Sequence, residues 1–173
     1  AVIIAGTGFN AGVVQQQNQM EIAGHGFILG DNGSGARIGV EAIRATLEYL
    51  DGIRLHSALI QAVLDKFQLT TANLIVEQAI DQRPGYYAEF APLVFEFAKQ
   101  DDPLAIEILS TVAGFIDRII QRLQQNQPAR TAMIGGIAQP IFPWLSTASK
   151  AMLSVPLCPP EKGALLLAGQ AMA

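Results

Sequence analysis

The first residues with the types and spacing for chemistry are Gly6, Thr7 and Gly8, which directly follow the apolar run 1–5. An apolar, β-branched run that ends in such a turn predicts a strand that presents bare backbone to a ligand. Glycine lets backbone N–H groups approach an anion without an intervening Cβ atom, and threonine adds a hydroxyl donor. The turn therefore favours anion binding, although on its own a tripeptide of this kind is more typical of a simple tight turn.

A second glycine-rich segment, residues 24–35, has glycine at positions 24, 26, 30, 33 and 35 and a single carboxylate, Asp31. Ordering such a loop is costly, because glycine loses more backbone freedom on folding than any other residue. The high density of glycine therefore indicates a binding site rather than a requirement of internal packing. Asp31 is a candidate acceptor of ligand hydroxyl groups, and a cap at a helix start is the alternative.

The elements around these segments begin with strands. Residues 9–23 predict two further strands of a small antiparallel meander, with a glutamine-rich hairpin tip at 15–19. From Ala36, apolar residues at helical spacing predict a helix that ends at Asp51-Gly52. This helix starts next to the glycine loop, so we expect its unpaired N–H groups to point into the loop.

The rest of the chain is predicted to be mainly helical. Asp102 and Pro103 have the types preferred at the N-cap and first position of a long helix that reaches about residue 125. Other helices are predicted over 59–67, from residue 70 or 71 to before Pro84, over 86–99, and from Gly163 to Ala168. Strands are predicted at 132–134, ending at Gly135-Gly136, and at 153–157. This order predicts one α/β layered domain, and Trp144 is assigned to its core.

Composition narrows the functional classes. The chain has 173 residues, of which 50% are hydrophobic and 15% charged, with a net charge of −4. No basic stripe is visible, which argues against nucleic acid and anionic membranes as partners. No apolar run approaches the roughly 20 residues of a membrane span. The single cysteine, Cys158, favours a reducing cytoplasm, and no residue spacing suggests a structural metal site.

Taken together, the glycine segments resemble the C-terminal domain of the N-acetylglucosamine and glucosamine kinases, which belong to the BadF/BadG-type branch of the sugar kinase, actin and heat-shock ATPase superfamily. The matching segments are Gly6-Thr7-Gly8, Gly24-x-Gly26 and Gly30-Asp31-x-Gly33-Ser34-Gly35. The resemblance covers nearly the whole chain. It implies that residues 1–173 form a ribonuclease-H-like (actin-like ATPase) domain, with a mixed sheet flanked by helices. The chain starts inside a strand-like run, so we expect a longer protein whose N-terminal lobe is absent from this chain.

The resemblance implies ATP-dependent phosphorylation of an amino sugar, N-acetylglucosamine or glucosamine, with Mg²⁺ carried by ATP. It assigns Gly6, Thr7 and Gly8 to the ATP phosphates. It places Ala88 at one border of the nucleotide, and it assigns Gly135 and Gly136 to the adenosine. It assigns sugar contacts to Gly24, His25, Gly26 and Asp31. It assigns no metal ligand within the chain. The catalytic aspartate and a first phosphate loop are expected upstream of Ala1.

Three positions depart from the family pattern. Phe9 stands where a serine is usual, which removes a hydroxyl near the phosphates. His25 replaces a tryptophan beside the sugar, and Asn32 replaces a glutamate. Two other functions are open. One is an activator subunit of the BadF/BadG type, which holds an iron–sulfur cluster on cysteines; Cys158 would supply at most one of these ligands. The other is a regulator that binds nucleotide or sugar without turnover. The expected partners are the N-terminal lobe and the small molecules, and the resemblance leaves room for a homodimer.

Overall fold

A four-stranded mixed sheet forms one side of the molecule in the computed structural model, which describes residues 1–15, 18–163 and 165. Its strands are β1 Val2–Ala5, β2 Phe9–Gln15, β3 Asn18–Ala23 and β4 Ala132–Ile134, in the order β3-β2-β1-β4. β1 is antiparallel to β2 and parallel to β4. The predicted meander and the strand at 132–134 are confirmed. β2 and β3 pair as far as Gln15 and Asn18, so the hairpin tip is shorter than predicted.

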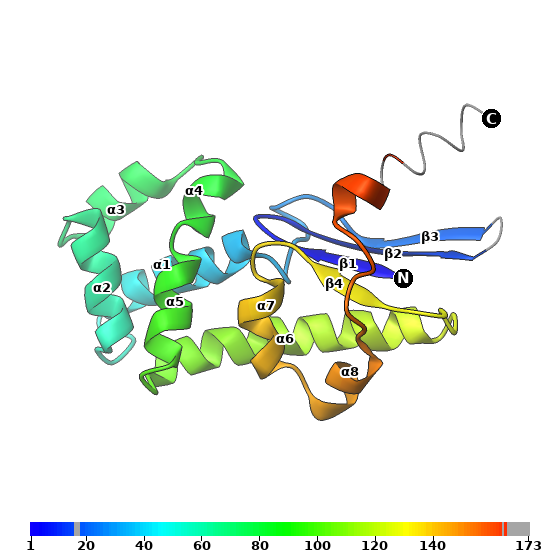
Figure 1. Ribbon diagram of the computed structural model, residues 1–173. Coiled ribbons are helices and arrows are strands. Elements are labelled where there is room, and N and C mark those ends of the chain that lie inside the picture. The colour runs from blue at the N-terminus through cyan, green and yellow to red at the C-terminus, as the bar shows by residue number, and fades with distance from the viewer. Residues whose placement is uncertain (16–17, 164, 166–173) are drawn as a thin grey trace.

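Helices cover one face of the sheet and extend beyond it as a helical half. The longest, α6, runs beneath the sheet and continues past α5 (Figure 1). The helices are α1 Gly35–Leu50, α2 Ala58–Phe67, α3 Ala72–Ala79, α4 Pro84–Ala88, α5 Ala91–Ala98, α6 Pro103–Gln124, α7 Ala138–Ile141, the 3₁₀ turn η1 Phe142–Trp144, and α8 Thr147–Met152. Among the described residues, no helix is both long and apolar enough to cross a membrane.

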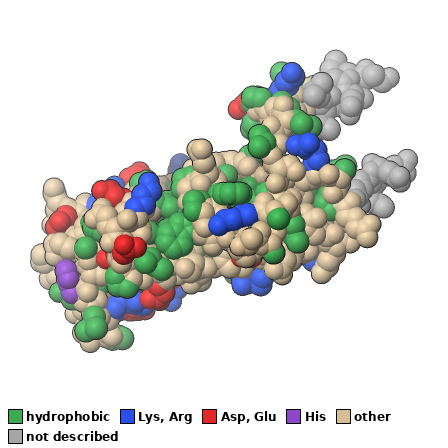
Figure 2. Space-filling view, turned by 60° about the horizontal axis from the view of Figure 1, so that its bottom comes forward, with side chains coloured by type: hydrophobic (Ala, Val, Ile, Leu, Met, Phe, Trp, Pro, Cys, Tyr) green, Lys and Arg blue, Asp and Glu red, His purple; other side chains and the backbone are tan. Residues whose placement is uncertain are grey.

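The core lies between the sheet and α6 and continues into the helical half, where α1, α2, α3 and α5 contribute to it. Along β1, Ile3 and Ala5 are buried whereas Val2 and Ile4 are exposed, as the two-residue period of a strand requires. The buried face packs with apolar residues that recur along α6 and include Ile116. A sheet covered on one face and a long amphipathic helix confirm the α/β layered class. On the face shown in Figure 2, basic and acidic side chains are scattered rather than gathered in a basic stripe.

Two predicted elements are wrong. The helix expected over 86–99 is two helices, α4 and α5, with a break at Glu89 and Phe90. Pro92 lies in the first turn of α5 and has no N–H to donate to the carbonyl of Ala88, so a continuous helix would lose that bond. Residues 153–157 form no strand, although Ser154 N–H donates to the Thr131 carbonyl at 2.8 Å. Most of the helix predicted for 163–168 lies outside the described residues.

Asp102 fixes the start of α6, and its replacement should destabilise the fold. The residue is 6% exposed, and its carboxylate accepts hydrogen bonds from the N–H groups of Leu104 and Ala105, both at 3.0 Å, and of Leu59 in α2, at 3.1 Å. Losing the cap and leaving a buried N–H unpaired should cost Asp102→Ala about 2–4 kcal/mol of unfolding free energy. Denaturant titration measures this. The exposed neighbour supplies the control, since Asp101→Asn should change stability by less than about 0.5 kcal/mol, and an equal loss in both variants would contradict the capping role.

Candidate functional site

A cleft of about 1080 Å³ lies between the β1–β2 turn, α5 and the α7–η1 segment. Segments that are far apart in the sequence form its walls. The lining residues are Gly6, Thr7, Gly35, Ala88, Ala91, Pro92, Phe95, Glu96, Lys99, Gly136, Ile137, Gln139, Pro140, Pro143 and Trp144. Four of the six residues that the sequence assigned to nucleotide therefore line one cavity, and its volume is that of a small-molecule site.

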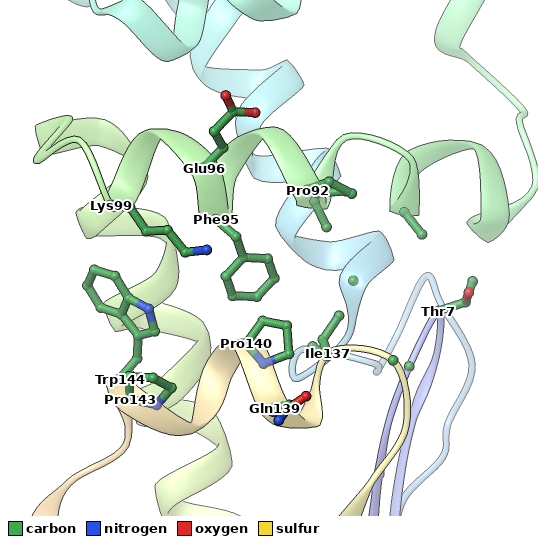
Figure 3. Close-up of a pocket in the computed structure, with 15 residues that line it drawn as sticks. Thr7, Pro92, Phe95, Glu96, Lys99, Ile137, Gln139, Pro140, Pro143 and Trp144 are labelled. Carbon is green, nitrogen blue, oxygen red and sulfur yellow. The ribbon is translucent and has the colours of Figure 1, made fainter.

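The two ends of the cleft differ in the groups that they present. Phe95 and Lys99 project from α5 toward the side on which Pro140 and Trp144 lie, whereas Glu96 points away from it (Figure 3). Thr7 lies at the opposite end, at the tip of the β1–β2 turn. The cleft thus has an apolar end with one ammonium group and a backbone-rich end.

The backbone-rich end is the turn Gly6–Gly8, called here the GTG turn. Gly6 N–H donates to the Gly8 carbonyl at 3.0 Å, which closes the turn. Among the described residues, the N–H groups of Thr7 and Gly8 and the Thr7 hydroxyl have no hydrogen-bond partner. Unpaired amides and a hydroxyl at one tight turn are the donors that bind phosphate oxygens.

The start of α1 holds this turn but does not offer its own amides to a ligand. Gly35 N–H donates to the Gly6 carbonyl at 2.7 Å, and Ala36 N–H donates to the Thr7 carbonyl at 3.2 Å. Arg37 N–H is capped by Ser34 Oγ at 3.0 Å. The expectation that unpaired N–H groups of this helix point into the glycine loop is therefore wrong. The carbonyls of the GTG turn satisfy two of the amides, so the helix orients the turn.

The two glycines after β4 differ in their surroundings. Gly135 has φ of +106°, and a Cβ atom there would clash with the backbone of Ala5. The same Ala5 carbonyl accepts a hydrogen bond from Ile137 N–H at 3.0 Å. Gly135 therefore lets β4 turn tightly against β1 and does not line the cleft. Gly136 does line it, and a Cβ atom there would have no neighbour within 4 Å.

Ala88 reaches the cleft because α4 lies directly against α1. Gly39 of α1 has no room for a Cβ atom, which would clash with the carbonyl of Tyr87. Tyr87 also donates its hydroxyl to the Ala79 carbonyl at 2.7 Å. These contacts fix the backbone immediately before Ala88, so the alanine's position on the cleft wall is set by packing.

The residues assigned to the sugar lie in a loop beside the cleft, residues 24–33, called here the Asp31 loop. Gly24, His25 and Gly26 are exposed, and the Gly26 carbonyl accepts Gly30 N–H at 2.7 Å. None of the four assigned residues lines the cleft itself. The structure thus places the four residues outside the cleft and brings Asp31 close to Gly8.

Asp31 is the most unusual residue of this loop. Its side chain lies so close to the GTG turn that a Cβ atom on Gly8 would be 3.1 Å from Asp31 Oδ2. It is 8% exposed and has φ of +57°, a conformation that non-glycine residues adopt rarely. Its carboxylate has no hydrogen-bond or ion-pair partner among the described residues. The cap of α1 is Ser34, so the capping alternative for Asp31 is wrong.

Phe9 does not point into the cleft. Its ring is buried on the inner face of the sheet, at 5.5 Å from the ring of Phe115 in α6. It also packs so closely on Gly33 that a Cβ atom there would clash with the ring. The replacement of the usual serine by Phe9 therefore adds a ring to the core and places no side chain in the cleft.

Sequence reasoning missed the apolar end of the cleft. It assigned Trp144 to the core, but this side chain is half-buried and lines the cavity with Phe95, Pro140 and Pro143. The available signal was the cluster of prolines and one tryptophan directly after Gly135-Gly136. Among the described residues, no group of three His, Cys, Asp or Glu side chains converges as a metal site.

Two curated proteins are similar to this chain over nearly its whole length. The chain is 34% identical to glucosamine kinase GspK of Vibrio cholerae and 30% identical to N-acetyl-D-glucosamine kinase of Dictyostelium discoideum, covering 98% and 96% of this chain. In both cases it spans 58% of the relative's own length.

The structures of relatives show the same fold. A crystal structure from Chromobacterium violaceum, provisionally named an N-acetylglucosamine kinase, matches with a TM-score of 0.88 at 30% identity, over 96% of this chain and 58% of that one. The family model of the BadF/BadG/BcrA/BcrD ATPases matches residues 1–168. The chain is therefore a member of the BadF/BadG/BcrA/BcrD ATPase family.

Proposed function

We propose that residues 1–173 are the C-terminal nucleotide- and sugar-binding domain of an ATP-dependent kinase that phosphorylates an amino sugar, N-acetylglucosamine or glucosamine. The observation that carries this proposal is the meeting of three segments. The GTG turn and Gly136 face one cleft, and Asp31, buried and unpartnered, lies against Gly8 beside it. The similarity to amino-sugar kinases supports the choice of substrate.

Phosphoryl transfer depends mainly on positioning and charge stabilisation, and the cleft offers groups for both. The free N–H groups of Thr7 and Gly8 bind phosphate oxygens. Gly136 leaves room for the nucleoside, and the apolar end between α5 and η1 accepts the base. Mg²⁺ enters with ATP and neutralises charge on its phosphates. The Asp31 carboxylate accepts hydrogen bonds from sugar hydroxyls, which orients the sugar toward the γ-phosphate.

Asp31 serves recognition in this proposal, and the proton acceptor comes from elsewhere. The chain spans 58% of the kinases that it resembles. We assign the catalytic aspartate and the first phosphate loop to an N-terminal lobe that closes over the sugar. The domain described here supplies one wall of that closed site.

The test is sugar-stimulated ADP release by the full-length protein. We expect turnover with N-acetylglucosamine or glucosamine in the presence of ATP and Mg²⁺, and background rates with glucose or without sugar. A coupled assay over a panel of hexoses and hexosamines measures this. ATP turnover that no sugar stimulates would favour an activator-type ATPase. Nucleotide or sugar binding without any turnover would favour a regulator. Either result would refute the kinase.

A further inference from the structure

One aromatic contact joins the Asp31 loop to the wall of the nucleotide cleft. The rings of Phe27 and Tyr87 are stacked, with centroids 5.0 Å apart and planes inclined by 24°. Phe27 lies in the Asp31 loop, between Gly26 and Asp31. Tyr87 directly precedes Ala88, which lines the cleft. The stack therefore connects the segment assigned to the sugar with the segment assigned to the nucleotide.

Phe27 is the anchored member of an otherwise exposed apolar tip. Ile28 and Leu29, which follow it, are 89% and 84% exposed. Phe27 is half-buried against Tyr87. Within the loop, the backbone bond from Gly30 N–H to the Gly26 carbonyl closes a turn around Phe27. A shift of Asp31 or His25 on binding a ligand would therefore be transmitted to the Phe27 ring.

Tyr87 is the rigid side of the contact. Its hydroxyl is bonded to the Ala79 carbonyl, its backbone lies against Gly39 of α1, and its ring packs edge-on against Tyr86. A residue held from three directions moves little, so its ring gives the Asp31 loop a fixed reference. Because α1 also holds the GTG turn through Gly35, the loop and the turn share one support.

We propose that Phe27 and Tyr87 are positioning residues, and that their stack couples the two halves of the site, so that sugar binding strengthens nucleotide binding and nucleotide binding strengthens sugar binding by the same factor. The inference rests on the proposed function. Neither side chain touches the reacting atoms. The stack holds the Asp31 loop against the cleft wall, so a ligand that fixes one of the two segments also restricts the other, and the second ligand loses less conformational freedom on binding.

The experiment measures the affinity of the full-length protein for a non-hydrolysable ATP analogue by calorimetry, with and without a saturating amount of the sugar that supports turnover. The wild type should bind the analogue about threefold to tenfold more tightly with sugar, the range expected for one aromatic pair. Phe27→Leu and Tyr87→Leu should each bring this factor close to one, and the double variant should lower it no further.

Three control variants separate coupling from general damage. Phe27→Tyr keeps a stacking ring and should keep the factor. Tyr87→Phe keeps the ring and loses only the bond to Ala79, so it should keep most of the factor. Ile28→Ala changes an exposed neighbour in the same loop and should leave the factor unchanged. If Tyr87→Leu does not fold, the Phe27→Leu variant alone tests the coupling, since Phe27 lies in a surface loop where the substitution should leave the fold intact.

The outcomes separate this inference from the proposed function. A wild type without sugar-dependent turnover would refute both. An active wild type whose affinity for the analogue is the same with and without sugar would refute only the coupling. So would an active Phe27→Leu variant that retains the full factor.

Discussion

Gly136→Val should weaken nucleotide binding about tenfold to 100-fold without lowering the melting temperature. Gly136 lines the cleft, and a Cβ atom there meets no protein atom within 4 Å, so the new side chain fits the folded protein. It would project into the space proposed for the nucleoside. Forcing extra methyl groups into a packed site costs about 1–3 kcal/mol, which corresponds to this range of affinity. Titration with a fluorescent ATP analogue measures the affinity.

The neighbouring glycine supplies a matched variant with the opposite result. Gly135→Val should lower the melting temperature by about 10 °C or more, because it combines a positive φ with a clash against the Ala5 backbone. Any loss of nucleotide binding in this variant would follow from the disturbed β1–β4 contact. If Gly136→Val bound the analogue with unchanged affinity, the nucleotide would lie elsewhere.

This pair of glycines shows where sequence reasoning reaches its limit. A Gly-Gly pair after a buried strand predicts close approach of backbone, but the pattern does not say whether a ligand or the protein approaches. Only the register of β4 beside β1 distinguishes them: it places Gly135 over Ala5 and leaves Gly136 facing the cleft. The resemblance to the kinases assigned both glycines to the adenosine, whereas in the structure only Gly136 of the two lines the cleft.

The elements with local signals were predictable, and the contacts between distant elements were not. The N-cap at Asp102 follows from two adjacent residue types, whereas its third bond, from Leu59, depends on how α2 packs on α5, beside the start of α6. The same distinction holds at α1. Its start was readable from the sequence, but the carbonyls that occupy its first amides belong to the GTG turn, nearly thirty residues earlier. The apolar end of the cleft was missed because Phe95 of α5 and Trp144 of η1 line it from distant parts of the sequence, which apolar periodicity does not bring together.

The second large effect is expected at Asp31. Asp31 is 8% exposed, and its carboxylate has no hydrogen-bond or ion-pair partner among the described residues, so a ligand that donates hydrogen bonds to it makes charge-assisted contacts that no protein group supplies. Each charge-assisted bond contributes about 1.5–3 kcal/mol, so removing two should lower kcat/KM for the sugar by roughly 10²–10⁴-fold. KM for ATP should change by no more than the threefold to tenfold effect of sugar proposed above, because the free amides of the GTG turn remain.

The choice of substitution at Asp31 decides how clearly the result can be interpreted. Alanine is strained at φ of +57°, so Asp31→Ala combines a loss of recognition with a loss of stability. Asparagine tolerates this conformation and keeps the shape of the side chain, so Asp31→Asn removes the charge alone. We expect Asp31→Asn to be at least as stable as the wild type in thermal unfolding, yet strongly impaired toward the sugar. Sugar kinetics that stay at the wild-type level in this variant would show that the buried carboxylate is not a ligand, and the loop would lose its assigned role.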